Sequence, residues 1–191
     1  MDAIFPVLLE VPAATRQLRG RELVQALSRH GRRALYRSAE LRGADLGTLL
    51  KSESGAPLPS NGWHWSLSHK REVAAGVVAS GPIGIDVEIR RPCSDALCRR
   101  IAAPEEWDLA GDVSEAMFFR FWTAKEAVLK AVGIGMKALS QCRITAVADH
   151  RTTCLGYRGQ DWRVAHFYTH DWVVAVTDAG AGIHWTLEAG G

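Results

Sequence analysis

Three acidic side chains and one lysine, carried by two short motifs, are the residues of this sequence whose types and spacing could do chemistry. In the motif GIDVEIRRP, Asp86 and Glu88 stand two positions apart at the end of an apolar run typical of a strand. Because side chains alternate between the faces of a strand, both carboxylates should project from the same face. Two like charges in this arrangement repel each other unless a cation lies between them. The motif therefore predicts a cation site.

The second motif, FFRFWTAKEAVLK, spans residues 118–130 and places Glu126 forty residues after Asp86. Its Trp122, Glu126 and Lys130 are four residues apart and should share one stripe of a helix. Glu126 could supply a third carboxylate, and an oxygen-only ligand set suits Mg²⁺, which completes its shell with substrate phosphates and water. Lys130, one turn later, would reach the same phosphates as a point charge.

Each of these features also has an ordinary structural explanation. A D-x-E pair often lies on a solvated sheet edge, and an i,i+4 pair such as Glu126 and Lys130 contributes only about 0.3 kcal/mol on a helix surface. A turn histidine such as His69 is commonly just exposed. Glu105 and Glu106 more often complement a helix N-terminus than act as bases. The arginines between residues 29 and 42 commonly form a solvated helix face. The order of the motifs therefore decides more than any one of them.

Composition places the site in an ordinary globular protein. The chain has 191 residues, 47% of them hydrophobic, which is enough to bury a core without disulfides or metal. A net charge of +2 argues against bulk attraction to nucleic acid or membranes. No C-x-x-C pair, signal peptide or membrane-spanning run is apparent, so we predict reduced thiols and a cytoplasmic protein. The cysteines are Cys93, Cys98, Cys142 and Cys154.

The elements that must position these residues are strands and helices in mixed order. Apolar periodicity and turn signals predict strands at 3–11, 64–68 and 72–80, helices within 15–46 and at 94–101, 104–110 and 114–132, and five further strands after residue 135. We therefore predict an α+β fold of two similar halves, 1–83 and 84–191, joined without a flexible linker. A site shared by both would lie at the seam between them.

Taken together and in this order, SLSH, GIDVEIRRP and FWTAKEAVLK followed by GIG resemble the motifs of the 4′-phosphopantetheinyl transferase family, in its Sfp-like type with two similar halves in one chain. The resemblance extends from about residue 55 to 134. It implies that the phosphopantetheine arm of coenzyme A is moved onto a serine of an acyl or peptidyl carrier protein. It also implies Mg²⁺ as cofactor and adenosine 3′,5′-bisphosphate as the released product. Two halves in one chain make a monomer sufficient.

The resemblance also assigns roles to individual residues. The Mg²⁺ ligands implied are Asp86, Glu88 and Glu126, and Lys130 would bind the diphosphate. Ser68 and His69 would contact a coenzyme A phosphate, as would Arg37 or, equally, Arg33. Glu106 would be the general base, with Glu105 or a metal-polarised water as alternatives.

One departure from the family pattern concerns the coenzyme A site. Family members often carry Gly-Lys-Pro ahead of the Ser-His pair, whereas this chain has Gly55, Ala56 and Pro57. The cation expected near the 3′-phosphate is therefore absent, and Lys51 or the arginines could replace it.

Two other functions compete with an active transferase. One is a catalytically weak homologue that only docks carrier proteins, and the other is a Mg²⁺-dependent phosphohydrolase acting on a nucleotide diphosphate. The intact acidic set counts against the first. Carrier proteins are typically acidic, so Arg90, Arg91 and the 114–119 region are predicted to dock them. The pathway that the carrier serves is left open.

Overall fold

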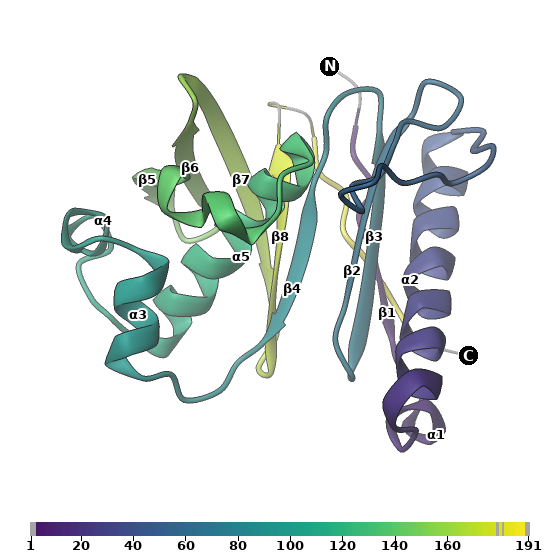
Figure 1. The fold of residues 1–191 in the computed structure, drawn as a ribbon, viewed down its shortest axis with the longest axis horizontal. Coiled ribbons are helices and arrows are strands. Elements are labelled where there is room, and N and C mark those ends of the chain that lie inside the picture. The colour runs from purple at the N-terminus through teal and green to yellow at the C-terminus, as the bar shows by residue number, and fades with distance from the viewer. Residues whose placement is uncertain (1–2, 179, 181, 190–191) are drawn as a thin grey trace.

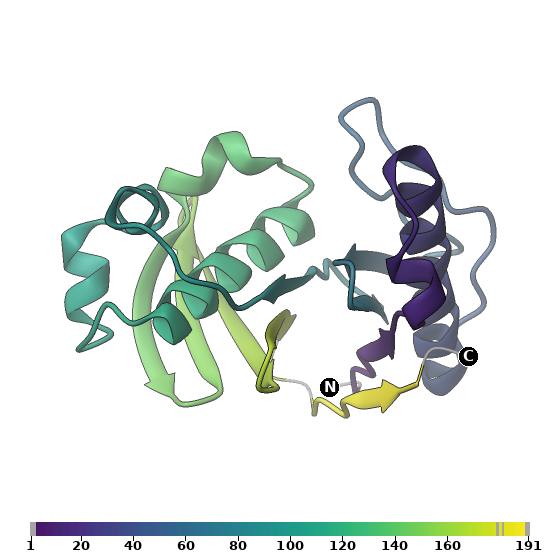
Figure 2. The ribbon, with the colours of Figure 1, turned by 90° about the horizontal axis from the view of Figure 1, so that it is seen from below.

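Two β-sheets and two long helices form this protein, as the computed structural model shows for residues 3–178, 180 and 182–189. Helix α2 (Gly20–Arg42) covers one sheet and helix α5 (Glu115–Val132) covers the other, and the two sheets meet between the helices (Figures 1 and 2). The predicted α+β class is confirmed. No helix within the described residues is long and apolar enough to cross a membrane.

The N-terminal sheet has the strand order β2-β3-β1-β9. Its strands are β1 (Val7–Glu10), β2 (His64–His69), β3 (Val73–Ala79) and β9 (Thr186–Glu188), and the short helix α1 (Ala13–Arg16) precedes α2. Strand β1 runs antiparallel to β3 and parallel to β9. The last strand of the chain therefore completes the sheet that the first strand begins, although its residues fall in the predicted C-terminal half.

The C-terminal sheet is antiparallel, in the order β4-β8-β7-β6-β5. Its strands are β4 (Ile85–Ile89), β5 (Arg143–Asp149), β6 (Thr152–Tyr157), β7 (Gln160–Tyr168) and β8 (Trp172–Asp178), and its helices are α3 (Asp95–Ile101), α4 (Pro104–Asp108), α5 and the 3₁₀ helix η1 (Met136–Gln141). Ser114 caps α5 by accepting a hydrogen bond from the Met117 N–H. The predicted strand pair of residues 64–68 and 72–80 is confirmed, with antiparallel register.

The contact between the sheets is apolar. Alternate residues of β4, including Ile85 and Val87, face the N-terminal sheet and pack with Leu8 and Val77 in one buried cluster. By the two-residue period of a strand, the intervening residues of β4 face the other way. That leaves Asp86 and Glu88 on the side of β4 that faces α5.

Glycine lets β4 and α5 approach closely. A Cβ at Gly84 would lie 1.9 Å from the Ala127 carbonyl oxygen of α5. Only glycine fits such a contact, so the helix is fixed directly against the start of the strand. The two elements that carry the acidic motifs are thereby held together. The two-half symmetry and the boundary between residues 83 and 84 stay predictions.

Candidate functional site

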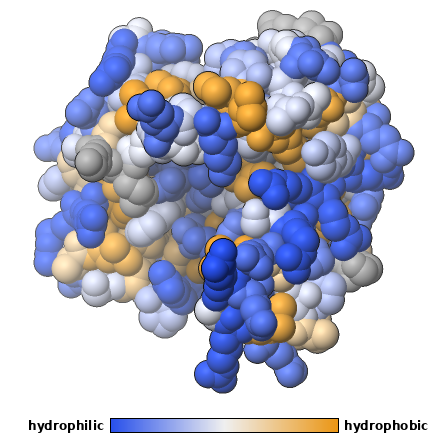
Figure 3. All heavy atoms as spheres, turned by 45° about the vertical axis from the view of Figure 1, so that its right-hand side comes forward, coloured by the Kyte–Doolittle hydropathy of each residue, from blue (hydrophilic) through white to orange (hydrophobic). Residues whose placement is uncertain are grey.

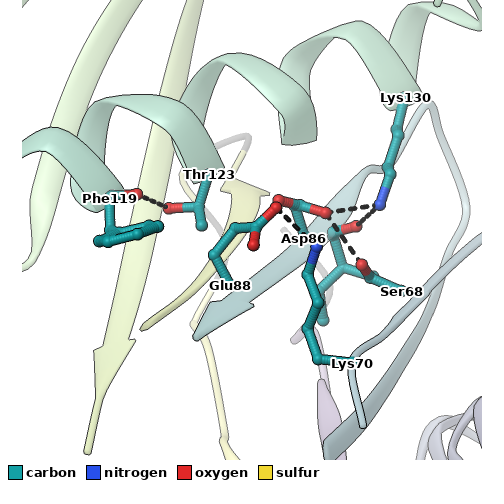
Figure 4. A network of polar contacts seen from close by, with 8 residues as sticks. Ser68, Lys70, Asp86, Glu88, Phe119, Thr123 and Lys130 are labelled. Carbon is teal, nitrogen blue, oxygen red and sulfur yellow. Dashed lines mark hydrogen bonds and ion pairs between the residues drawn. The ribbon is translucent and has the colours of Figure 1, made fainter. Parts of the chain in front are cut away.

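Asp86 lies at the centre of a polar network between β4, β2 and α5. Its side chain is buried, and its Oδ1 accepts hydrogen bonds from Ser68 Oγ at 2.9 Å and from Lys130 Nζ at 2.7 Å (Figure 4). Its Oδ2 is buried and has no hydrogen-bond partner within the described part of the chain. Since buried polar atoms are nearly always bonded, this oxygen is an open position for a ligand.

Glu88, two residues along β4, is also buried and also has a lysine partner. Lys70 Nζ lies 2.7 Å from its Oε1 (Figure 4). Burial raises the pKa of Glu88, while the Lys70 contact opposes the rise. The expected same-face placement of Asp86 and Glu88 agrees with their register on β4, opposite Ala175 and Val173 of β8.

Glu126 brings a third carboxylate within electrostatic range. Burial, followed by the charge of Asp86, raises the pKa of Glu126 to about 7, and Lys130 one turn later opposes this shift. Glu88 adds to the rise. Among residues 3–178, 180 and 182–189, no group of three or more His, Cys, Asp or Glu side chains lies in a geometry that could hold a metal ion. The three carboxylates therefore influence one another electrostatically without forming a metal site in the described part of the chain.

The donor set nevertheless fits a hard cation. All three side chains offer carboxylate oxygens, which Mg²⁺ prefers, and Asp86 Oδ2 has no hydrogen-bond partner among the residues that the structure describes. Lys70 and Lys130 now balance two of the charges, and both keep part of their side chains exposed. A bound cation could therefore take over their role beside Asp86 and Glu88, with the lysines free to contact an anion.

A cavity of about 220 Å³ borders the network on the side of Lys130. Its walls come from the 51–57 loop, from β2 and from the C-terminal end of α5 with the turn that follows, and include Lys51, Trp65, Leu67, Leu129, Lys130 and Ile134. Gly133 ends α5 in the left-handed conformation, with φ of 74°, and so turns the chain around this wall. The cavity is thus lined by residues on both sides of the predicted boundary at residue 83.

The surface near this cavity mixes polar and apolar groups. Leu50 and Leu58, which flank the lining segment 51–57, are 57% and 41% exposed. Figure 3, which brings the right-hand side of Figure 1 forward, shows hydrophobic patches set among hydrophilic side chains. A ligand with both an apolar body and charged groups suits such a surface.

Ser68 and His69, both predicted to bind phosphate, lie at the network. Ser68 is bonded to Asp86, and burial followed by the charge of Lys130 lowers the pKa of His69. His69 is therefore neutral at pH 7 and presents one donor and one acceptor nitrogen.

The two predicted arginines lie elsewhere. Arg37 Nε contacts Glu188 of β9 at 2.9 Å, and its Nη1 contacts Glu40 at 2.7 Å. Arg33 and Arg37 border a separate surface hollow with Glu188, and neither lines the cavity at Lys130. Of the replacements predicted for the missing Gly-Lys-Pro lysine, only Lys51 lies at this cavity. The coenzyme A contacts assigned to the arginines stay predictions without geometric support.

Glu106, the predicted base, belongs to a different environment. It is 3% exposed, and its Oε1 accepts hydrogen bonds from Lys125 Nζ and the Ile144 N–H, both at 2.7 Å. Its Oε2 accepts from the Ala103 N–H at 2.9 Å. The structure does not bring Glu106 into the Asp86 network, and Glu105 is highly exposed beside Arg143.

Lys70 is the site residue that sequence reasoning missed. It follows the Ser-His pair in a predicted turn, where a lysine attracts no attention. Its signal in the sequence is the two-residue period that runs from Ser66 through Ser68 to Lys70. Ser66 Oγ accepts a hydrogen bond from the Ile85 N–H of β4, and Ser68 Oγ donates one to Asp86. Lys70 extends this face by one step.

Comparison with known proteins gives consistent matches. The family model of the 4′-phosphopantetheinyl transferase superfamily matches residues 82–177. The 4′-phosphopantetheinyl transferase HetI of Nostoc sp. is 37% identical over 97 residues, which is 47% of this chain and 41% of that protein. The transferase psf-1 of Bacillus pumilus is 36% identical over 78 residues, or 39% of this chain and 34% of that protein. The Bacillus subtilis transferase Sfp is 32% identical over 77 residues. The matched segment spans less than half the length of each of these relatives.

Proposed function

This chain belongs to the 4′-phosphopantetheinyl transferase superfamily, and on that premise we propose that it transfers the phosphopantetheine arm of coenzyme A to a serine of an acyl or peptidyl carrier protein. Mg²⁺ is the proposed cofactor and adenosine 3′,5′-bisphosphate the proposed by-product. The observation that carries the proposal is Asp86, whose buried side chain joins β2, β4 and α5 beside a cavity and keeps one oxygen without a hydrogen-bond partner in the described part of the chain.

Asp86, Glu88 and Glu126 would hold the metal ion. Bound there, Mg²⁺ supplies positive charge that stabilises the oxygens of a diphosphate during phosphoryl transfer. Glu126 on α5 lies within electrostatic range of Asp86 and Glu88 on β4, and the glycine contact at Gly84 fixes the spacing of these elements.

Lys130 would bind the diphosphate directly. Its Nζ is bonded to Asp86 Oδ1 and to the Ile85 carbonyl oxygen, and the residue also lines the cavity. It is thus held in place before a substrate arrives, which lowers the cost of ordering it. Positioning coenzyme A and a carrier serine in line at this point accounts for much of the expected rate.

The cavity would receive the nucleotide end of coenzyme A. Trp65, Leu129 and Ile134 give it apolar walls, and Lys51 places a cation at its rim. We assign to Lys51 the contact with the 3′-phosphate that a lysine at position 56 would otherwise make. His69, neutral at pH 7, can donate one hydrogen bond to a phosphate oxygen.

The carrier protein would dock beside β4. Arg91 is exposed, Arg90 lies 3.6 Å from Glu115 at the start of α5, and Val113 is 58% exposed. A basic and apolar surface of this kind complements an acidic helical partner. Action as a monomer in the cytoplasm, without nucleic acid or membrane, completes the proposal.

The deciding experiment measures the mass of a purified apo acyl carrier protein after incubation with this protein, coenzyme A and Mg²⁺. We expect the gain of one phosphopantetheine arm, lost with chelator and in Asp86→Ala and Glu126→Ala variants. Coenzyme A consumed without any carrier would instead indicate a phosphohydrolase. Binding without transfer, tested on carriers from several pathways with folded protein, would leave only the docking function.

A further inference from the structure

The buried pair of Glu106 and Lys125 lies outside the Asp86 network yet touches the same helix. Lys125 Nζ and Glu106 Oε1 are 2.7 Å apart, and their side chains are 1% and 4% exposed. We propose that this pair is a strut that sets the position of α5, so that Glu106 acts as a positioning residue for Glu126 and Lys130. The inference rests on the proposed function, for which Glu106 is otherwise the candidate base.

The contacts of Glu106 leave it little freedom to take a proton from a substrate. Both of its oxygens accept hydrogen bonds, from Lys125 and Ile144 on one side and from Ala103 on the other. A general base needs an oxygen within about 3 Å of the substrate hydroxyl. Burial among these donors leaves no such oxygen exposed, so the geometry favours a structural task.

Lys125 connects the strut to the elements around α5. Besides Glu106 it bonds the carbonyl oxygen of Ile101, the last residue of α3, at 2.7 Å. Its partner Glu106 lies in α4 and accepts hydrogen bonds from the Ala103 N–H, just before α4, and from the Ile144 N–H at the start of strand β5. One side chain of α5 thereby holds three neighbouring elements.

The strut and the site occupy different faces of one helix. Successive residues of an α-helix are 100° apart, so Lys125 points into the C-terminal core while Glu126 points towards β4. On the β4 side the helix rests on Gly84, with no room for a side chain. Rotation of α5 about its axis would move Glu126 and Lys130 away from Asp86, and the strut opposes that rotation.

The test is a double-mutant cycle with Glu106→Met, Lys125→Met and the two combined, and with Arg143→Met as control. Arg143 lies 3.7 Å from Glu106 but is half exposed, so its loss should change little. Each single variant removes one partner of the buried ion pair, and we expect it to lose about 100-fold in transfer rate, as displacement of reacting groups does. The double variant removes both charges, and its two methionines fill a similar volume and so keep the spacing between α4 and α5, which should restore most of the rate and the melting temperature.

A base would behave differently. If Glu106 were the general base, the Lys125→Met variant would still have that base, whereas the double variant would lack it. The double variant would then be no more active than Glu106→Met, even with its melting temperature restored. That result would overturn the inference. If the methionine variants do not fold, Glu106→Gln with Lys125→Met keeps an acceptor for the Ile144 N–H, and the same comparison applies.

Metal affinity gives a readout that stability alone would not change. Mn²⁺ binding, followed by electron paramagnetic resonance without substrates and well below the melting temperature, should weaken in each single variant and recover in the double. Equal Mn²⁺ affinity in all variants would contradict positioning. If the wild type transfers nothing to any carrier, the proposed function fails, while melting temperature and Mn²⁺ affinity still decide whether the strut exists.

Discussion

The two long helices of this protein pack on their sheets in the same way but carry different residues. Helix α2 lies against β3 at Gly76, where a Cβ would be 2.3 Å from the Leu35 nitrogen, and α5 lies against β4 at Gly84. Each helix ends at a glycine in the left-handed conformation, Gly43 and Gly133. The backbone arrangement is therefore no guide to which helix bears the site.

The difference lies in the charged side chains. The buried face of α2 is apolar apart from His30 and Ser38, and Ser38 Oγ accepts the Val78 N–H. The buried residues of α5 include Arg120, bonded to Thr153 and to backbone carbonyls, and Lys125. Buried charges need partners, so α5 is tied to many elements by directional bonds. We infer that α2 serves as scaffold and α5 as the positioned half of the site.

Substituting the two contact glycines would test whether the packing is equivalent. Gly84→Ala and Gly76→Ala should each lower the free energy of unfolding by about 3 kcal/mol, because the new methyl group meets backbone atoms. Gly81→Ala, which meets no atom within 4 Å, is the control. Urea unfolding measures the effect, and equal stability of all three variants would show that the helices can shift freely.

Transfer activity would test whether α5 carries site residues and α2 does not. Lys130→Met on α5 should lower kcat about 100-fold, the loss typical for one charge-stabilising group. Arg37→Met on α2 removes the ion pairs with Glu40 and Glu188, and transfer should change less than about twofold, as for a surface ion pair. Initial rates over a range of coenzyme A concentrations decide this, because a lost coenzyme A contact would raise the KM. A large loss of transfer rate in the Arg37→Met variant would support the coenzyme A contact predicted for Arg37 from the sequence.

The sequence predicted local features well and long-range ones poorly. The alternation in IDVEI and the four-residue spacing from Glu126 to Lys130 are local, so both acidic motifs could be placed on their elements. The pairing of β9 with β1 joins the two ends of the chain, which no local pattern reveals.

Side-chain roles away from the motifs were equally hidden. Glu106 was predicted from its distance along the chain, whereas its partners come from α5 and β5. Arg37 lies on a helix whose exposed positions look alike in sequence, and only the fold shows that it faces β9. A residue's neighbours, unlike its face on an element, depend on tertiary packing.

The halves should also differ in their response to acid. Burial lowers the pKa of His166 in the C-terminal half to about 3, whereas burial and two arginines lower the pKa of His30 on α2. A folded pKa below the unfolded value of about 6.5 means that stability is complete above pH 6.5 and falls as the pH drops towards 3. For His166 the loss between pH 7 and pH 5 is about 2 kcal/mol.

Melting temperatures between pH 7 and pH 4 would measure this loss. His166→Gln, which can still bond to Thr153, should flatten the acid side of the profile. His30→Gln is the matched variant in the other half and should flatten it less. The same slope in His166→Gln and wild type would assign the acid response to other groups.

The smallest expected effect concerns the docking surface beside β4. Arg90→Glu with Arg91→Glu should raise the KM for an acidic carrier about fivefold or more at low salt and leave kcat nearly unchanged, because rim charges mainly alter association. Arg29→Glu with Arg32→Glu, both exposed on α2, reverses the same charge away from β4 and serves as the control. Transfer rates at rising carrier concentration, repeated at high salt, distinguish the two pairs, since only a pair that contacts the carrier should change KM at low salt and lose that effect when salt screens the charges. An unchanged KM in the first pair, or an equal rise in both, would mean that the carrier does not select the α5 side of the molecule.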